Sequence, residues 1–591
     1  MRFASSPIND APTSVWLVLL LLAVAVHAFG LGGQYVPTNG DEMVYAHIAR
    51  ATAETGHWLP LASELVDTRN TKPPLLFWQG MVAGDWGHHW SMAALRAPSL
   101  LYTLLIAAAV AWPVHLITRS RRDALIAACV YLAFLSTFRY GRPYLTSAPE
   151  TFWFSLPLFG LLWQRLRAPG TGPGWGLHIV FGLGLGLGLA YKSFALIAPA
   201  AAAWWLALVV SEASLNWRTL LVHTLRTAMS AALALAVFAL WFVLDPDPAA
   251  VWREFIVGEN ASKFSDARGY WHEALLGGGS SVWAQLLAYA VNAGLLAFVV
   301  IGLAWTGWKN RYRPLLGARL PPHLGILLAW AAVWLIVFTL PSQRSARYVI
   351  PAMPAVAMLL ALHWRDIPRR WFLPTLPLAA IALLILARIA WVSHEFGLAG
   401  SAEFAATLLA VGLGALALGL SLWRPAWTRA GTVLACLLVY ATFDLTVAPM
   451  DGASGRYASG AGNALPQRAR VAVPNGFNGQ FERFQFLLPG TYRFIPYDTE
   501  ARALARLAPG QPRPAPAQQL EGLLSAHDAV IWVQSGMSET APSCVPVCTV
   551  VGARWLLKSR HQSGEITLSN LWYPQQWLFR REWLLTRAAP R

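Results

Sequence analysis

Charged side chains are scarce in this chain. Asp, Glu, Lys and Arg make up only 13% of its 591 residues, whereas 56% of the residues are hydrophobic, and the mean hydropathy is +0.45. Because a soluble protein carries about 25% charged residues, this composition excludes an ordinary soluble enzyme and a disordered chain. The apolar runs are continuous instead of alternating, which predicts membrane-spanning helices and not a transmembrane barrel.

Acidic residues are fewer than basic ones. The chain has 29 Asp and Glu against 45 Lys and Arg, and its formal net charge is +16. In a soluble protein this excess would suggest nucleic acid. In a membrane protein it indicates basic cytoplasmic loops and basic sites for an anionic substrate. We therefore expect membrane lipids, and no nucleic acid, as partners.

Cysteine is nearly absent, with 4 residues in the chain. Cys129 and Cys436 lie in apolar runs, where a thiol usually behaves as an inert core residue. Cys544 and Cys548 lie close together in a polar region, and we expect a disulfide between them if that region is outside the cytoplasm. Two free thiols are the alternative. No Cys-x-x-Cys or Cys/His zinc pattern occurs.

The sequence also gives little support for a metal or nucleotide site. His88 and His89 are adjacent, but no third ligand has a suitable spacing and no His-Glu-x-x-His motif occurs. The glycine-rich run before Lys192 is not a P-loop, because Tyr191 stands where the Walker pattern requires Gly. We expect no required cofactor, and dependence on a divalent metal is left open.

What the chain does contain is a series of about 13 apolar runs, each near the ~20 residues that cross a bilayer. They lie at residues 15–29, 93–117, 124–138, 151–164, 176–191, 195–210, 227–244, 283–307, 323–340, 348–363, 372–391, 403–422 and 430–447. With a cytoplasmic N-terminus, every inner loop is basic, as the positive-inside rule requires. We predict an α-helical polytopic membrane domain over residues 1–448, with a long first outer loop at 30–91.

The composition changes after residue 448. Gly, Pro, Asn and Gln increase, and short strand-like segments predict a soluble α/β domain over residues 449–591. The odd number of spans puts this domain on the periplasmic side. The predicted strands and helix are Ala529–Val533, Thr549–Val551, Trp555–Leu557, Glu565–Leu568 and Thr499–Leu507.

The first outer loop has the densest set of polar residues. Asp41 and Glu42 open a helical segment just after the first span, where the helix dipole favours an ionised carboxylate that can accept a proton from a hydroxyl. Lys72 precedes two prolines and sits on non-helical backbone, where it is well placed to meet a phosphate. The alternative is that Asp41 only caps the helix and Lys72 lies at the membrane interface.

Three motifs follow one another along this loop: Asp-Glu with Tyr-x-x-Ile-Ala-Arg, then Gly-His-Trp-Leu-Pro, then Lys-Pro-Pro-Leu-x-Phe-Trp. Together with residues 341–354, they resemble the GT-C membrane glycosyltransferases, in the group of the aminoarabinose transferases and protein O-mannosyltransferases, nearest the former. The resemblance covers residues 15–447. It implies a GT-C fold and a sugar donor linked to a polyprenyl phosphate.

The resemblance also implies roles for single residues. The first-loop Asp of the family takes part in catalysis, which maps to Asp41 with Glu42 beside it. The Lys of the Lys-Pro-Pro motif contacts donor phosphate, which maps to Lys72. The Arg that ends the Asp-Glu helix maps to Arg50, near the sugar.

The family places a second acid where this chain has Ser147. Glu150 lies one helical turn later, on the same helix face, and is a candidate to substitute as a catalytic acid; an interfacial residue is the alternative. Lys192, at the outer end of the fifth predicted span, is a candidate phosphate ligand or a snorkelling side chain.

Two further loops complete the predicted site. Arg344 and Arg347, with Tyr348 beside the second, form a predicted fork for the donor phosphate. The segment with Glu259, Asn260 and Lys263 resembles the loop that covers the sugar in the family, with a solvated loop as the alternative.

The function we expect is transfer of a sugar from an undecaprenyl-phosphate donor to a lipid acceptor, lipid A or a related glycolipid, by an inverting mechanism in the bacterial inner membrane. Transfer to protein hydroxyls and a surface-polysaccharide ligase or polymerase are alternatives. A lipid or polysaccharide transporter or flippase is an alternative of another class. Transporter sites lie near the bilayer midplane in repeated halves, whereas the charges here gather in outer loops.

Overall fold

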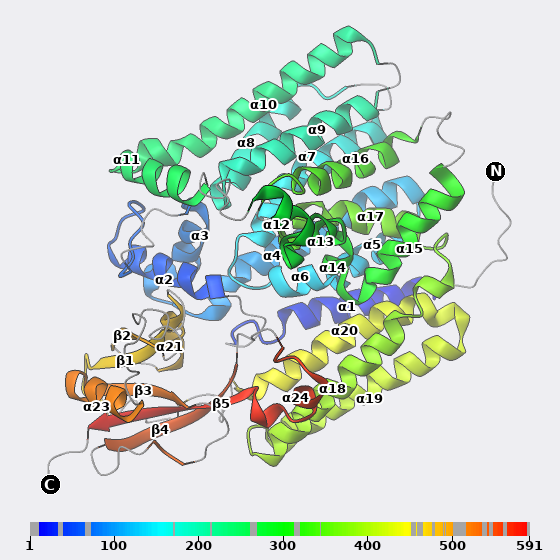
Figure 1. Cartoon of the computed structure of the whole chain (residues 1–591). Coiled ribbons are helices and arrows are strands. Elements are labelled where there is room, and N and C mark those ends of the chain that lie inside the picture. The colour runs from blue at the N-terminus through cyan, green and yellow to red at the C-terminus, as the bar shows by residue number, and fades with distance from the viewer. Residues whose placement is uncertain are drawn as a thin grey trace.

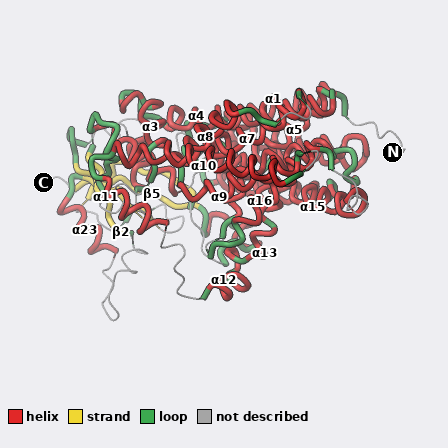
Figure 2. Tube along the Cα trace, turned by 90° about the horizontal axis from the view of Figure 1, so that it is seen from above, coloured by secondary structure: helices red, strands yellow, loops and turns green. Residues whose placement is uncertain are grey.

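The computed structural model describes most of the chain. The described residues are 11–33, 40–65, 72–168, 172–212, 215–260, 269–312, 320–342, 344–450, 457, 465–475, 479–488, 490, 492–499, 516–534, 540–542, 548–558 and 564–587. Helices form one large bundle, and a small sheet lies at the same end of the bundle as α3 and α11 (Figures 1 and 2).

The helices follow one another from the first span to the end of the bundle. Their bounds are α1 (Thr13–Ala28), α2 (Gly40–Glu54), α3 (Leu75–Ala83), α4 (Met92–Thr118), α5 (Arg121–Ala133), α6 (Leu135–Tyr140), α7 (Ser147–Arg167), α8 (Trp175–Tyr191), α9 (Ile197–Val210), α10 (Trp217–Leu244), α11 (Pro248–Val251), α12 (Tyr270–Leu276), α13 (Val282–Leu286), α14 (Ala288–Ala293), α15 (Ala297–Thr306), α16 (Pro322–Val337), α17 (Met353–Leu362), α18 (Thr375–Glu395), α19 (Ser401–Trp423) and α20 (Thr428–Val447).

The bundle is that of a multi-pass membrane protein. Among the described residues, six helices have the length and apolar composition to cross a membrane: Met92–Thr118, Trp217–Leu244, Ala288–Lys309, Arg369–Glu395, Ser401–Trp423 and Pro425–Val447. Five shorter apolar helices accompany them: Thr13–Ala28, Trp175–Tyr191, Phe194–Val210, Pro322–Val337 and Ala346–Leu362. Each predicted apolar run contains helix, but the number of 13 spans stays a prediction.

Two predicted spans are interrupted: the run at 124–138 forms α5 and α6, and the run at 283–307 is divided further. The run at 283–307 forms α13, α14 and α15 instead of one helix. Gly294 interrupts it with a φ of +61°, and a Cβ at this position would lie 2.5 Å from the Cβ of Leu135. Glycine is therefore required there both for the backbone conformation and for the close approach of the neighbouring helix.

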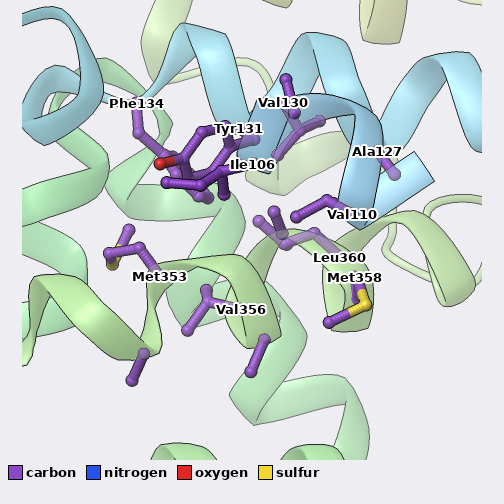
Figure 3. Close-up of a cluster of buried hydrophobic side chains, with 14 of the residues drawn as sticks. Ile106, Val110, Ala127, Val130, Tyr131, Phe134, Met353, Val356, Met358 and Leu360 are labelled. Carbon is purple, nitrogen blue, oxygen red and sulfur yellow. The ribbon is translucent and has the colours of Figure 1, made fainter. Parts of the chain in front are cut away.

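The core of the bundle holds α17 in place. Every residue from Met353 to Ala361 is buried, and α17 packs between α4 and α5, against side chains such as Ile106, Val110 and Val130 (Figure 3). A 3-10 helix, η10 (Ala346–Ala352), leads directly into α17. Because a close-packed core tolerates little displacement, the polar residues at the start of η10 have a fixed position.

A buried ion pair holds the segment that precedes α7. Arg142 donates to both carboxylate oxygens of Asp444 in α20, at 2.9 and 3.1 Å, and also to the carbonyls of Val26 and Phe29 at the end of α1. Both charged side chains are fully buried. Removing one partner of such a pair typically costs about 3–5 kcal/mol, so the start of α7 is firmly anchored.

The C-terminal region forms a five-stranded sheet with strand order β2-β1-β3-β5-β4. β1 pairs in parallel with β2 and β3, and β5 pairs antiparallel with β3 and β4. The bounds of its elements are β1 (Arg470–Asn475), η15 (Gln480–Glu482), α21 (Arg483–Leu487), β2 (Arg493–Asp498), α23 (Pro516–Ala526), β3 (Ala529–Gln534), β4 (Cys548–Leu557), α24 (Leu568–Trp572) and β5 (Phe579–Arg587).

The strand predictions were right in part. β3 coincides with the strand predicted at Ala529–Val533, and the two short strands predicted after it are one strand, β4, with an irregular register between Val550 and Gly552. The strand predicted at Glu565–Leu568 is wrong, because α24 begins there instead. The helix predicted at Thr499–Leu507 lies outside the described residues from position 500 on. The domain boundary at 448 and 449 stays a prediction.

Candidate active site

The first-loop aspartate meets an arginine from a distant part of the chain. Asp41 lies in the first turn of α2, where the helix dipole favours its negative charge. Nη1 of Arg347, in η10, donates to its Oδ2 at 3.4 Å. Both side chains are partly exposed, Asp41 at 38% and Arg347 at 20%. The predicted catalytic carboxylate and a predicted phosphate ligand are therefore neighbours.

Arg347 has two further contacts. Its Nε and Nη2 atoms donate to Oγ of Ser147 at 3.4 and 3.3 Å, and its guanidinium lies over the ring of Tyr140, 5.1 Å from the centroid. Ser147 opens α7 at the position where the related family has an acid. In this chain a hydroxyl at that position accepts from the arginine, without adding a second negative charge.

A second ion pair lies beside the first. Lys192 follows the last residue of α8, and its Nζ lies 3.0 and 2.9 Å from the two carboxylate oxygens of Glu150. Glu150 is 2% exposed, whereas Lys192 is 24% exposed. The ammonium also lies 5.6 Å from the ring centroid of Tyr348. Both oxygens of the buried carboxylate of Glu150 therefore lie against the ammonium of Lys192, and the catalytic role of Glu150 stays a prediction.

These contacts link residues from four separate segments. Asp41 pairs with Arg347, and the ring of the next residue, Tyr348, lies near the ammonium of Lys192. Lys192 in turn pairs with Glu150. Ser147, one helical turn before Glu150, accepts a hydrogen bond from Arg347 and so closes the series of contacts. Both cations are accessible from outside, and each is held by a carboxylate or a hydroxyl. A phosphate that enters here can accept charge-assisted hydrogen bonds from both cations.

Lys72 lies close to the start of α3. It is half-buried and precedes Pro73 and Pro74, both buried, which lead into that helix. The backbone there is not helical, as predicted. Its role as a phosphate ligand stays a prediction.

Glu42 does not share the environment of Asp41. It is fully buried, and both of its carboxylate oxygens accept from Arg96 of α4, at 2.7 and 2.9 Å. The backbone N–H of Tyr144 donates to Oε1 of Glu42 at 2.7 Å. These contacts attach α2 to the bundle and leave Glu42 without exposed surface in this structure, so its catalytic role stays a prediction.

The side chain of Arg50 points to the C-terminal region. Its Nε and Nη2 atoms donate to the two carboxylate oxygens of Glu482, in η15, at 2.5 and 3.0 Å. Nδ1 of His47 lies 2.9 Å from Oε2 of the same residue. Burial opposes the charge of Arg50, but the hydrogen bonds and the attraction of Glu482 prevail and raise its pKa above the ordinary value. In this structure Arg50 forms an ion pair with Glu482, and its contact with a sugar stays a prediction.

Arg344 is separated from the phosphate fork that the sequence predicted. It is 4% exposed, and it donates to the carbonyls of Thr339 and Ser280, at 2.7 and 3.2 Å. Its guanidinium lies over Tyr270, 5.2 Å from the ring centroid. Arg344 therefore ties together the segments around α12 and η10, whereas the side chain of Arg347 donates to Asp41.

Several predicted residues cannot be placed. A π-helix spans Trp252–Asn260, but the side chains of Glu259 and Asn260, and all of Lys263, lie outside the described residues. Cys544 lies outside them too. Cys548 is disulfide-bonded, while Cys129 and Cys436 are free and buried. The pairing of Cys544 with Cys548 and the sugar loop stay predictions.

No group of three or more His, Cys, Asp or Glu side chains is placed to hold a metal ion within the part of the chain that the structure describes. Nδ1 of His89 lies 3.0 Å from Oδ2 of Asp85 at the surface, and this pair has no further ligand of these types there. Dependence on a metal stays untested.

Sequence reasoning missed the partners of the acidic residues. Arg96 of α4 pairs with Glu42 of α2, and Glu482 of η15 pairs with His47 and Arg50 of α2. Arg96 had a detectable signal, since a charged residue inside an apolar run is costly unless it is paired. Glu482 lies in a polar segment, where an acid is ordinary, and only the fold brings it to α2.

Known proteins resemble the chain in both sequence and fold. Residues 16–249 match the family described as dolichyl-phosphate-mannose-protein mannosyltransferase. Two proteins named undecaprenyl phosphate-alpha-4-amino-4-deoxy-L-arabinose arabinosyl transferase are similar in sequence. The one from Sodalis glossinidius is 27% identical over 60% of this chain and 59% of its own length. The one from Pectobacterium carotovorum is 25% identical over 68% of this chain and 65% of its own length. The chain thus spans less than two thirds of the length of either relative.

A solved structure is similar over almost the whole chain. The crystal structure of ArnT from Cupriavidus metallidurans bound to undecaprenyl phosphate has a TM-score of 0.60 at 16% identity and covers 98% of this chain and 100% of its own. At that identity the likeness concerns the fold alone. The fold, the family match over residues 16–249 and the relatives agree with the resemblance of the first-loop motifs to the GT-C glycosyltransferases, in the group of the aminoarabinose transferases and the protein O-mannosyltransferases.

Proposed function

We propose that the chain is a glycosyltransferase that moves a sugar from undecaprenyl phosphate to a lipid acceptor, lipid A or a related glycolipid. The observation that carries this proposal is the meeting of Asp41, Arg347, Lys192 and Glu150 at the ends of the helices. It supplies a proton acceptor beside two cations. The names of the similar transferases support the choice of donor.

The reaction is a single displacement at the anomeric carbon of the donor sugar. A hydroxyl of the acceptor attacks this carbon, its proton passes to Asp41, and the bond between the sugar and the phosphate oxygen breaks. Undecaprenyl phosphate leaves with the bonding electrons, and the anomeric centre is inverted. Asp41 acts as general base, a role that contributes typically 10²–10⁴-fold to a rate.

The leaving phosphate gains negative charge as the bond breaks. Arg347 and Lys192 stabilise this charge, with Lys72 and Tyr348 as further ligands, because fixed cations at developing charge lower the barrier most effectively. Glu150 keeps the ammonium of Lys192 directed outward. When the donor phosphate binds, it attracts Arg347 away from Asp41. Donor binding therefore frees the carboxylate of Asp41 to accept a proton.

The site lies on the periplasmic side of the bacterial inner membrane in this proposal, and the C-terminal region lies there too. The basic inner loops support this orientation.

The reaction as written involves no metal ion, so we propose that none is required. Glu259, Asn260 and Lys263 are proposed to contact the sugar, and Cys544 and Cys548 to form a disulfide in the oxidising periplasm.

A protein acceptor is the second candidate, because the matched family is described as a protein mannosyltransferase. The test is transfer of radiolabelled sugar in membranes that contain the chain, with lipid extract and membrane protein separated afterwards. Label in lipid supports the proposal, and label in protein favours the second candidate. The absence of label that depends on Asp41, with the donor pool shown to be present, would overturn both and leave lipid transport to be tested.

A further inference from the structure

The helix that carries Asp41 is held from two sides. On one side, Glu42 pairs with Arg96 of the bundle, both fully buried. On the other, His47 and Arg50 bind Glu482 of the C-terminal region. The proposed base is therefore attached to a helix whose position depends on both parts of the chain.

The contact with the C-terminal region is a buried polar cluster. His47 and Glu482 are fully buried, and Arg50 is 11% exposed. Glu482 receives three hydrogen bonds, one from His47 and two from Arg50. Nε2 of His47 accepts from the backbone N–H of Glu64, at 3.2 Å. His47 thus donates through Nδ1 and accepts through Nε2, so Glu482, α2 and the first loop form one network.

Close packing accompanies these hydrogen bonds. The ring of Phe481 lies 5.1 Å from that of His47, and a Cβ at Gly479, whose φ is +78°, would lie 2.8 Å from the Cα of Val44. The backbone of the C-terminal region therefore touches the backbone of α2. Such a contact transmits displacement, because packed interfaces deform little.

We propose that Glu482 is a positioning residue for the transfer reaction, acting through His47 and Arg50 to hold α2 so that Asp41 reaches the acceptor hydroxyl. This assigns the C-terminal region a part in catalysis without contact with the substrates, and it rests on the proposed function. The donor-phosphate ligands Arg347 and Lys192 belong to the bundle and not to α2. Loss of Glu482 is therefore expected to affect turnover more than donor binding.

The test compares Glu482→Gln with Arg388→Ala in the full chain. Arg388 makes a different contact between the two parts: its Nε donates to the carbonyl of Trp572 at 2.9 Å, away from α2. Hydrogen exchange of the α2 amides and steady-state transfer are measured for both. We expect faster exchange over α2, kcat lower by about 10- to 100-fold and donor KM within about twofold for Glu482→Gln, and no change for Arg388→Ala.

Unchanged α2 exchange in Glu482→Gln would overturn the proposal, and so would faster exchange with an unchanged kcat. If Glu482→Gln does not fold, Arg50→Lys replaces it; this variant keeps the charge but loses the two-point geometry, and we expect the same changes at smaller size. Failure of the proposed function is distinguishable, because transfer is then absent in the unaltered chain, while the exchange measurement still decides whether Glu482 holds α2.

Discussion

Lys192 and Glu150 form an ion pair in which one ammonium faces both oxygens of one buried carboxylate, at 2.9 and 3.0 Å. The two residues come from the end of α8 and the start of α7. The ammonium of Lys192 is partly exposed to solvent, whereas the carboxylate that binds it is buried. An ion pair of this geometry favours a role for Glu150 in orienting Lys192 over a role in catalysis.

The first prediction concerns Glu150. We expect Glu150→Gln to raise the KM for the donor and to lower kcat by only about tenfold, since the lysine loses its orientation but the base remains; a tenfold change corresponds to about 1.4 kcal/mol. The measurement is steady-state transfer at varied donor concentration. A loss of turnover as large as that of Asp41→Asn would instead assign Glu150 a catalytic role.

The second prediction concerns Arg347. Replacement by Lys keeps the charge but removes the planar group that contacts Asp41, Ser147 and the ring of Tyr140. We expect donor affinity to fall about 10- to 100-fold, because a hydrogen bond to a charged group contributes about 1.5–3 kcal/mol. Binding of undecaprenyl phosphate to the purified chain measures this. The matched control is Arg344→Lys, for which we expect unchanged donor affinity; a fall as large as that of Arg347→Lys would return Arg344 to the phosphate site.

The third prediction concerns the buried pair of Glu42 and Arg96. We expect Glu42→Gln to destabilise the fold by about 3–5 kcal/mol, because it leaves the guanidinium of Arg96 uncompensated. Asp41→Asn, one residue away and partly exposed, is the control and is expected to change stability by less than about 0.5 kcal/mol. Thermal unfolding in detergent compares the two. Equal stability of both variants would contradict the anchoring role of Glu42.

The fourth prediction concerns Cys544 and Cys548. We expect both thiols to resist a maleimide before reduction and to react after it, because a periplasmic disulfide persists in an oxidising compartment. Cys129 and Cys436 are buried in the bundle, and their replacement by Ala gives a background without other thiols. Labelling of both remaining cysteines without reduction would contradict the disulfide and weaken the proposed orientation.

The sequence predicted the residue types of the site better than their partners. Asp41 and Arg347 stood out because charged groups are rare in this chain and flank apolar runs. Their contact depends on the packing of α17 against α4 and α5, which no local pattern contains. The partners of Arg344 were not predictable for a related reason: the two arginines are close in sequence, but in the structure Arg344 donates to backbone carbonyls.

The C-terminal sheet was harder to predict than the helices. A membrane-spanning helix is indicated by a long apolar run. The strand β5, in contrast, carries Glu582 at a buried position, where it pairs with Arg554 of β4 and Arg483 of α21. Buried charges of this kind interrupt the alternation that predicts a strand. Their pairing is a tertiary property, and so is the contact between Glu482 and α2.

The measurement that tests the account most directly is turnover of Asp41→Asn under conditions in which donor binding is monitored in the same preparation. The account predicts that the variant folds and binds the undecaprenyl-phosphate-linked donor at least as well as the unaltered chain, because Arg347 is no longer held by a charge. Its sugar transfer is predicted to be slower by about 10²–10⁴-fold. Normal transfer by this variant would contradict the role of Asp41 as the general base, and with it the proposed mechanism.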